Sequence, residues 1–197
     1  KGKIDYDNAL FGWFKLRKDL ETAKAMWPFI DMKVTKTHYS KQFYDGNVGM
    51  LISGEWFPGF MLAGRKDNLL VGYTWNDWAV TRLPCDVKPY VTMGTPTFCH
   101  VTTFAKNKEG ALRFIAWLGG PEGAKLAAKA GVLPAMVTPE VKKILTESIP
   151  DAQSIDYFTE AKKTYPTLHS KYGSRIDALM GTMMEEYLLG KISDADF

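Results

Sequence analysis

Trp56 and Glu55 are the residues of this sequence whose types and position best suit contact with a ligand. They follow Ser53 and Gly54 at the end of residues 48–52, an apolar run typical of a buried strand. Ligands of open α/β sheets tend to bind where strands end. The flat face of an aromatic ring can pack against the C–H groups of a sugar, while nearby polar groups bind its hydroxyls. We therefore predict that Trp56 contacts a ligand; the alternative is that it packs the next helix onto the sheet.

The chain is rich in aromatic residues, beyond what a core of its size demands. Six Trp, nine Tyr and eleven Phe make up 13% of its 197 residues. Trp75 and Trp78 flank a turn, where one of them could reach a cleft or cover the edge of a core. The remaining tryptophans lie in helical patterns or at a helix end and are interpreted as packing residues: Trp13, Trp27 and Trp117.

Composition and charge exclude several classes of protein. Hydrophobic residues make up 46% and charged residues 24%, the balance of a globular protein. The net charge of +3 and the absence of a basic cluster argue against nucleic acid as a partner. No run approaches the ~18 apolar residues that a membrane-spanning helix needs. Residues 1–5 do not resemble a secretion signal, so any targeting peptide is expected to lie outside this sequence.

The residue patterns of common enzymes are missing, and we predict no catalytic residue, metal or cofactor. Cys99 and His100 are neighbours in a predicted strand, so their side chains would point to opposite faces. Glu185 and Glu186 would project about 100° apart on a helix. Two cysteines in total are too few for a zinc site or a disulfide framework, and a bridge from Cys85 to Cys99 is left open.

Strands are predicted mainly in the first half of the chain. Besides residues 48–52, the short β-rich runs are 69–74, 77–81 and 97–104. Between them, a helix capped by Asp7 is expected to stop before Pro28, and a shorter helix spans residues 37–44. Because these strands alternate with helices, the predicted class is α/β.

Helices are predicted through most of the second half. The first is capped by Asn107 and ends at Gly119; Pro121 opens the next, and Gly131 closes it. Further helices start at Thr138 and cover residues 155–164 and 172–188.

The segment from Phe43 to Trp56, with the sequence FYDGNVGMLISGEW, resembles extracellular solute-binding proteins of the maltose-binding type, which deliver sugars to ABC importers. The segments 104–111, 131–135 and 190–193 resemble later parts of that family in the same order. Each match is weak alone, but together they span nearly the whole chain.

The resemblance implies a periplasmic-binding-protein-like (type II) α/β fold with two lobes around a cleft. Residues 1–90 and 148–197 would form most of the C-terminal lobe. Residues 91–147 would be a segment of the N-terminal lobe, most of which would be absent.

The resemblance also implies the site. Trp56 would stack on the sugar from the second lobe. The loop with Gly94 and Thr95 would line the cleft, and Tyr172 and Arg175 would contribute from the start of the last long helix. The maltose-type tryptophan is missing at that last position.

The implied function is that of the substrate-binding component of an ABC importer, without enzymatic activity. Its partners would be a saccharide and the permease subunits, with membrane contact only through the permease or a missing lipid anchor. It would be extracytoplasmic, either periplasmic or a lipoprotein on the outer face of the membrane.

Three alternatives stay open. The ligand could be charged, with Arg175 or Arg82 binding a glycerol phosphate-type solute, or Glu55 and Asp177 binding a polyamine. The chain could instead be a fragment of a carbohydrate-active enzyme, which would need two facing carboxylates. It could also be an interaction domain with no small ligand.

Overall fold

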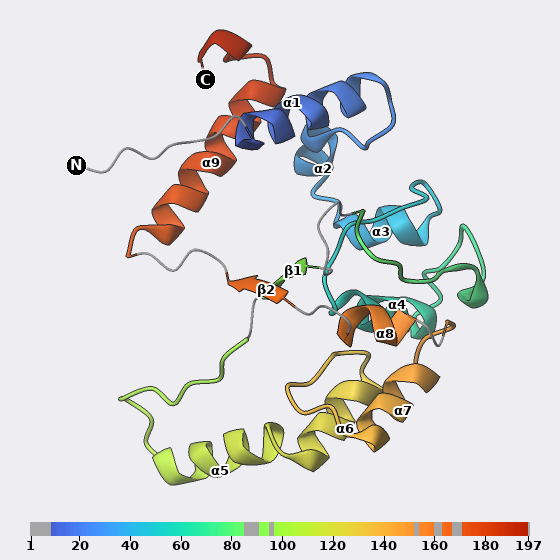
Figure 1. The fold of residues 1–197 in the computed structure, drawn as a ribbon, viewed down its shortest axis with the longest axis vertical. Coiled ribbons are helices and arrows are strands. Elements are labelled where there is room, and N and C mark those ends of the chain that lie inside the picture. The colour runs from blue at the N-terminus through green and yellow to red at the C-terminus, as the bar shows by residue number, and fades with distance from the viewer. Residues whose placement is uncertain are drawn as a thin grey trace. The chain divides into compact units, whose positions relative to one another are not determined.

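The chain folds mainly into helices joined by extended loops (Figure 1). A computed structural model describes residues 9–84, 91–94, 97–151, 154–159, 163–166 and 171–196. The α-helices are α1 (Ala9–Thr22), α2 (Phe29–Thr35), α3 (Tyr39–Tyr44), α4 (Phe57–Lys66), α5 (Lys108–Leu118), α6 (Pro121–Lys129), α7 (Pro139–Glu147), α8 (Ser154–Thr159) and α9 (Gly173–Leu188). Two 3-10 helices, η1 (Trp75–Asp77) and η2 (Asp194–Asp196), and two strands, β1 (Val91–Gly94) and β2 (Lys163–Pro166), complete the described elements.

The strands predicted from apolar and β-branched runs are wrong. Residues 48–52, 69–74, 77–81 and 97–104 form loops, turns and η1, with no strand among them. Met50 is 91% exposed and Phe104 is 92% exposed. A strand needs both a pairing partner and a covered face, and a propensity read from one segment supplies neither.

The predicted two-lobe α/β fold is also wrong for the structure described. β1 and β2 form a two-stranded parallel pair, in which Val91 lies opposite Lys163 and Gly94 opposite Pro166. Within the described ranges no other sheet is formed. Of the helix predicted over 155–164, residues 155–159 belong to α8 and residues 163–164 to β2.

The helix predictions in the second half are largely confirmed. The Asn107 side chain accepts a hydrogen bond of 2.8 Å from the Gly110 amide and so caps α5. Pro121 opens α6, and α9 ends just before Gly190. α2 was not predicted: Pro28, read as the end of a helix, is the residue that precedes a new one.

The chain divides into two compact units. Unit 1 comprises Lys1–Gln42 and Leu168–Phe197, and unit 2 comprises Phe43–Thr167. The lobe boundaries expected above stay a prediction, because these units are defined only by contacts within the present chain.

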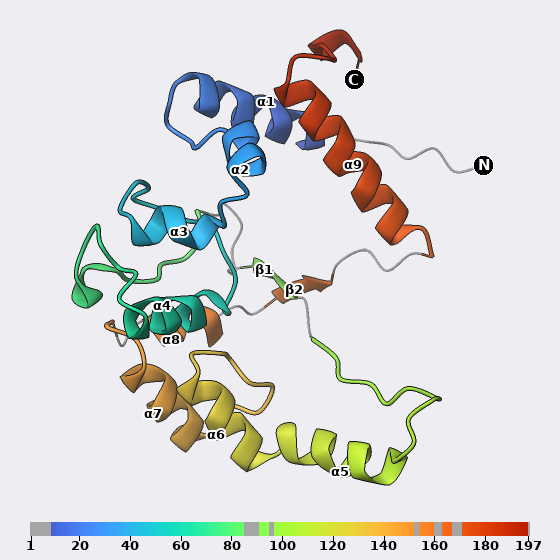
Figure 2. The same cartoon turned by 180° about the vertical axis from the view of Figure 1, so that it is seen from behind.

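Unit 1 is built on the packing of α1 and α2 against α9, which lie together in both views (Figures 1 and 2). Tyr187 of α9 is the centre of its core and is 1% exposed. Its ring meets the Phe11 ring edge to face at 5.7 Å, and the Lys18 ammonium lies 4.2 Å from its centroid. The Tyr187 hydroxyl donates a hydrogen bond of 2.9 Å to Asp194, which ties η2 to α9.

Unit 1 should lose stability at alkaline pH because of Tyr187. Burial, followed by the hydrogen bond to Asp194, raises the pKa of Tyr187 from 10.0 to about 12. The unfolded chain therefore loses this proton before the folded unit does. The stabilisation is complete below pH 10 and declines as the pH rises from 10 toward 12. Urea unfolding of the wild type and of Tyr187→Phe at several alkaline pH values would measure it.

The phenylalanine variant keeps the ring and its contact with Lys18, so it removes only the titrating hydroxyl. We expect it to be about 1 kcal/mol less stable at neutral pH, as is typical for one lost hydrogen bond. We also expect a smaller loss of stability above pH 10. An identical alkaline decline in both proteins would contradict the role of Tyr187.

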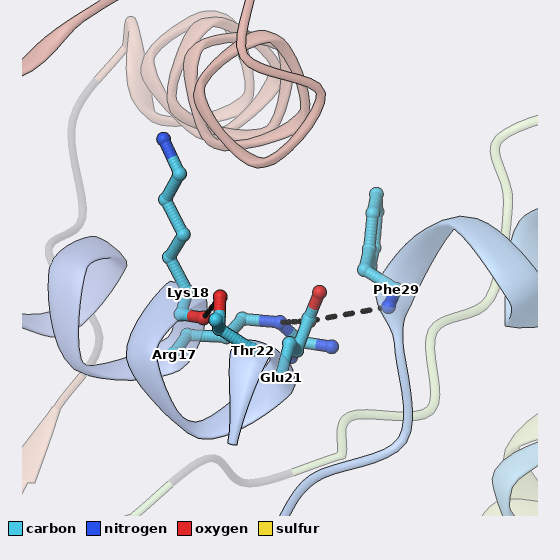
Figure 3. Close-up of polar contacts among 5 residues, drawn as sticks. All are labelled: Arg17, Lys18, Glu21, Thr22 and Phe29. Carbon is cyan, nitrogen blue, oxygen red and sulfur yellow. Dashed lines mark hydrogen bonds and ion pairs between the residues drawn. The ribbon is translucent and has the colours of Figure 1, made fainter. Parts of the chain in front are cut away.

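A carboxylate links α1 to the start of α2 (Figure 3). Glu21 accepts a hydrogen bond of 2.7 Å from Arg17 Nε and one of 3.1 Å from the backbone amide of Phe29. The Arg17 guanidinium also lies 5.3 Å from the centre of the Phe29 ring. The Phe29 amide is one of the helix-start donors that lack a partner inside a helix, so Glu21 both satisfies it and sets where α2 begins.

Unit 2 has its core where α4, α6, α7 and α8 bury small and aliphatic side chains. α6 contacts both α5 and α7, and α7 contacts α8. Met61, Ala128 and Val141 are fully buried, and Ile155 is 2% exposed. Ser154, at the start of α8, accepts a hydrogen bond of 2.8 Å from the Val80 amide and so connects the long loop after α4 to this core.

Candidate functional site

Trp56 lies at the start of α4, as the residue that precedes its first turn. Pro58, in that first turn, has the fixed backbone angle of a helix start, as the sequence predicted. Trp56 is 47% exposed, so its indole is available to solvent. About half of the residue is covered, and the alternative interpretation, that Trp56 packs the next helix, stays a prediction.

The backbone of Gly54 lies against the Trp56 ring. A Cβ atom placed on Gly54 would lie 2.2, 2.4 and 2.6 Å from Cζ3, Cη2 and Cε3 of the indole. Because three consecutive ring atoms are almost equally close, the Gly54 backbone lies against the face of the ring and not beyond its edge. From the sequence, Gly54 is interpreted as a turn residue only. Its position two residues before Trp56 is the one feature of the sequence that indicates contact with the ring.

Glu55 lines a small hollow of unit 2. The hollow is small: its cavity volume is ≈ 10 Å³, about enough for one water molecule. It is bounded by Glu55, Pro58, Gly131, Leu133, Leu145, Ser148, Ile149, Ile155 and Phe158. Its lining is almost wholly apolar; Pro58, Leu145 and Ile155 are buried there, whereas Glu55 and Ser148 are half-buried. The residues that line the hollow could not be predicted from the sequence, because they come from segments far apart in the chain.

The turn at Gly131 brings the lining of the hollow against α4. Gly131 has a φ of +72°, and its amide and that of Val132 donate to the Ala128 and Ala127 carbonyls, closing α6 in a Schellman motif. A Cβ on Gly131 would lie 2.8 Å from the Gly59 amide nitrogen. This approach of two backbones is possible only because neither glycine carries a side chain.

The other predicted site residues lie elsewhere. Gly94 is the last residue of β1, and Thr95 lies outside the described residues. Tyr172 and Arg175 belong to unit 1, at the start of α9; Tyr172 is 53% exposed and Arg175 is exposed. Within unit 2, Glu55 and Trp56 are neighbours in sequence at the start of α4, and the assignment of all six residues as ligand contacts stays a prediction.

The other tryptophans differ in how far they are buried. Trp78 is buried, and Trp75 contacts it edge to face at 5.4 Å while the Arg65 guanidinium lies 4.7 Å from the Trp75 ring. These two therefore cover a core edge. Of the tryptophans predicted to pack, Trp27 is half-buried and Trp117 lies 5.8 Å from the Phe114 ring while 45% exposed; Trp13 is 64% exposed.

Within unit 2, aromatic side chains pack against the start of α4. The Phe43 ring meets Phe57 at 5.4 Å and Tyr73 at 5.5 Å, both edge to face. The Tyr73 hydroxyl lies 4.0 Å from the Met61 sulfur, and burial raises the pKa of Tyr73 well above its ordinary value. The first turn of α4, which directly follows Trp56, is thus packed against an aromatic cluster.

One solved structure shows a fold similar to that of this chain. No protein-family model matches the chain. No curated protein matches it. Its fold is similar to the crystal structure of a sugar transporter from Rhizobium etli in an open conformation, with a TM-score of 0.66 and 23% identity. The likeness covers 92% of this chain and 47% of that one, so the chain spans about half the length of the similar protein.

This comparison corrects two further predictions. The similar structure is described as a sugar transporter and not as a solute-binding component, so the predicted role as substrate-binding component of an ABC importer is wrong. The extracytoplasmic location is wrong with it, because that location followed from the binding-protein assignment. No helix of the described ranges has both the length and the apolar character needed to span a bilayer. The family resemblance itself stays a prediction.

Proposed function

We propose that the protein takes part in sugar transport and that a sugar ring stacks on Trp56. The observation that carries the proposal is the Trp56 indole, 47% exposed at the start of a well-packed helix. An aromatic face held on a rigid element offers a sugar's C–H groups an apolar surface at little entropic cost. The likeness to a sugar transporter supports sugar as the ligand class.

Polar groups beside the ring can supply the hydrogen bonds that a sugar needs. Glu55 precedes Trp56, and its carboxylate accepts hydrogen bonds only, which suits the hydroxyl donors of a sugar. Ser148 lines the hollow, and its hydroxyl donates to the Leu145 carbonyl, which leaves its oxygen as an acceptor. An apolar face next to a few polar groups is the usual composition of a small-molecule site.

Titration of the protein with glucose, galactose, xylose, ribose and maltose tests the proposal. Binding would be followed by tryptophan fluorescence and by calorimetry. We expect saturable binding of at least one of these sugars. Trp56→Ala should raise its Kd by about tenfold or more, because truncating a tryptophan at the centre of a binding site commonly costs about 2 kcal/mol.

The matched control is Trp117→Ala on α5. Trp117 is 45% exposed, close to the value for Trp56, so both variants remove a similar amount of aromatic surface. We expect the control to leave the Kd unchanged. Equal weakening by both variants would contradict Trp56 as the site, and a wild-type protein that binds none of the five sugars would contradict the ligand class.

A further inference from the structure

We infer that Gly54 is a positioning residue for Trp56, which holds the indole so that only one of its faces is open to a ligand. The positioning itself is a property of the folded chain. Its consequence, that a saccharide ring binds on that single open face, rests on the proposed function.

The geometry at Gly54 carries this inference. Three adjacent atoms of the indole lie 2.2–2.6 Å from the position where any other residue would place its Cβ. Real Cβ atoms do not approach a ring so closely, so every residue except glycine would push the indole off its place. Trp56 as a whole is 47% exposed, so the ring keeps surface open to solvent although Gly54 lies against one face.

The backbone at Gly54 does not itself require glycine. The residues with positive φ are Lys24, Lys36, Asn68, Gly46, Gly131 and Gly190 among those that the structure describes, and Gly54 is not one of them. The hydrogen bond of 3.0 Å from the Phe57 amide to the Gly54 carbonyl is formed by the main chain and survives substitution. An alanine at this position therefore conflicts with the Trp56 ring and not with the turn.

The conflict can be relieved by rotation of the Trp56 side chain, because the close atoms are at its far end. We therefore expect Gly54→Ala to fold and to shift the thermal midpoint by less than about 3 °C. Its effect falls on the ring instead. A ring that leaves its support is no longer held at one angle, so the surface offered to a ligand is no longer preorganised.

Gly49→Ala is the matched control. Gly49 is exposed in the same loop, also without a positive φ, and a Cβ there would meet nothing within 4 Å. It carries the same chemical change without contact with the ring, so we expect it to behave as the wild type in every measurement below.

The first test needs no ligand. The contribution of Trp56 to the near-ultraviolet circular dichroism is the difference between each protein and the same protein with Trp56→Ala. A ring in fixed packing gives a strong signal there, and a mobile one gives little. We expect most of this contribution to be lost in Gly54→Ala and kept in Gly49→Ala. An unchanged Trp56 contribution in Gly54→Ala would overturn the positioning role.

The second test is a double-mutant cycle of sugar binding, with the tightest binder among glucose, galactose, xylose, ribose and maltose. We expect Gly54→Ala to raise the Kd roughly three- to tenfold when Trp56 is present, and not at all when it is already alanine. The same rise in both backgrounds would overturn the inference while the proposed function stands. If none of the five sugars binds, the proposed function and the single-face mode of binding both fail, and the dichroism test still decides whether Gly54 positions the ring.

Discussion

Replacement of Gly123 by alanine is expected to destabilise unit 2 by about 3 kcal/mol or more. Gly123 lies in the first turn of α6, directly after the corner at which α5 ends. A Cβ there would lie 2.1 Å from the carbonyl oxygen of Leu118 and 2.6 Å from its Cα. All the close atoms belong to the main chain, so no side-chain rotation can relieve the clash. The two helices would have to separate, and chemical denaturation followed by circular dichroism would measure the cost.

Gly181→Ala is the matched control for that substitution. Gly181 also lies inside a helix, α9, but it is exposed and a Cβ there would meet nothing within 4 Å. Alanine loses less backbone entropy than glycine when a helix forms, so this change should stabilise the protein by about 0.5–1 kcal/mol. Two glycine-to-alanine changes in helices are thus expected to have opposite signs. A stabilising Gly123→Ala would show that the corner between α5 and α6 is looser than described.

Helix ends were the best predicted feature of the fold, and the reason is local. Asn107 and Gly131 act within one turn of their own position, through hydrogen bonds to neighbours in sequence. Lys24 shows the limit of this reasoning. It holds a φ of 56° after α1, in the position where glycine is usual, so no residue type signalled that helix end.

Strands were poorly predicted because their stability depends on segments distant in sequence. Residues 48–52 have the composition of a buried strand, yet Ile52 is 68% exposed and the segment is not a strand. β1 and β2 pair across about seventy residues of intervening chain. Neither the partner nor the covering layer of a strand can be read from its own residues.

The candidate site was predictable in part. The residue types of Trp56 and Glu55, following an apolar run, indicate this position as a candidate site without the structure, and that assignment stays a prediction. The support of the ring by Gly54 and the lining of the hollow by Gly131 and Leu145 depend on tertiary contacts that no local pattern encodes. Tyr172 and Arg175 were chosen through a family resemblance, and the structure assigns them to unit 1, whereas Trp56 belongs to unit 2.

Gly131→Ala is expected to destabilise unit 2 by about 3 kcal/mol, through two separate effects. A residue other than glycine costs about 1–2 kcal/mol in the left-handed conformation that Gly131 adopts at φ +72°. Its Cβ would also lie 2.8 Å from the Gly59 nitrogen and 2.8 Å from Leu62 Cδ1, so α4 would have to move away. The leucine side chain can rotate, but the main chain of Gly59 cannot.

Gly190→Ala separates these two effects. Gly190 closes α9 in the same Schellman geometry with a φ of +71°, and nothing lies within 4 Å of its Cβ position. This control should therefore cost only the conformational part, about 1–2 kcal/mol. The difference between the two variants, measured by urea unfolding, is the free energy of the contact between α6 and α4 that forms the hollow beside Glu55. Equal destabilisation by both substitutions would mean that α4 moves without cost, and the start of α4, next to Trp56, would then not be a rigid support for a ligand.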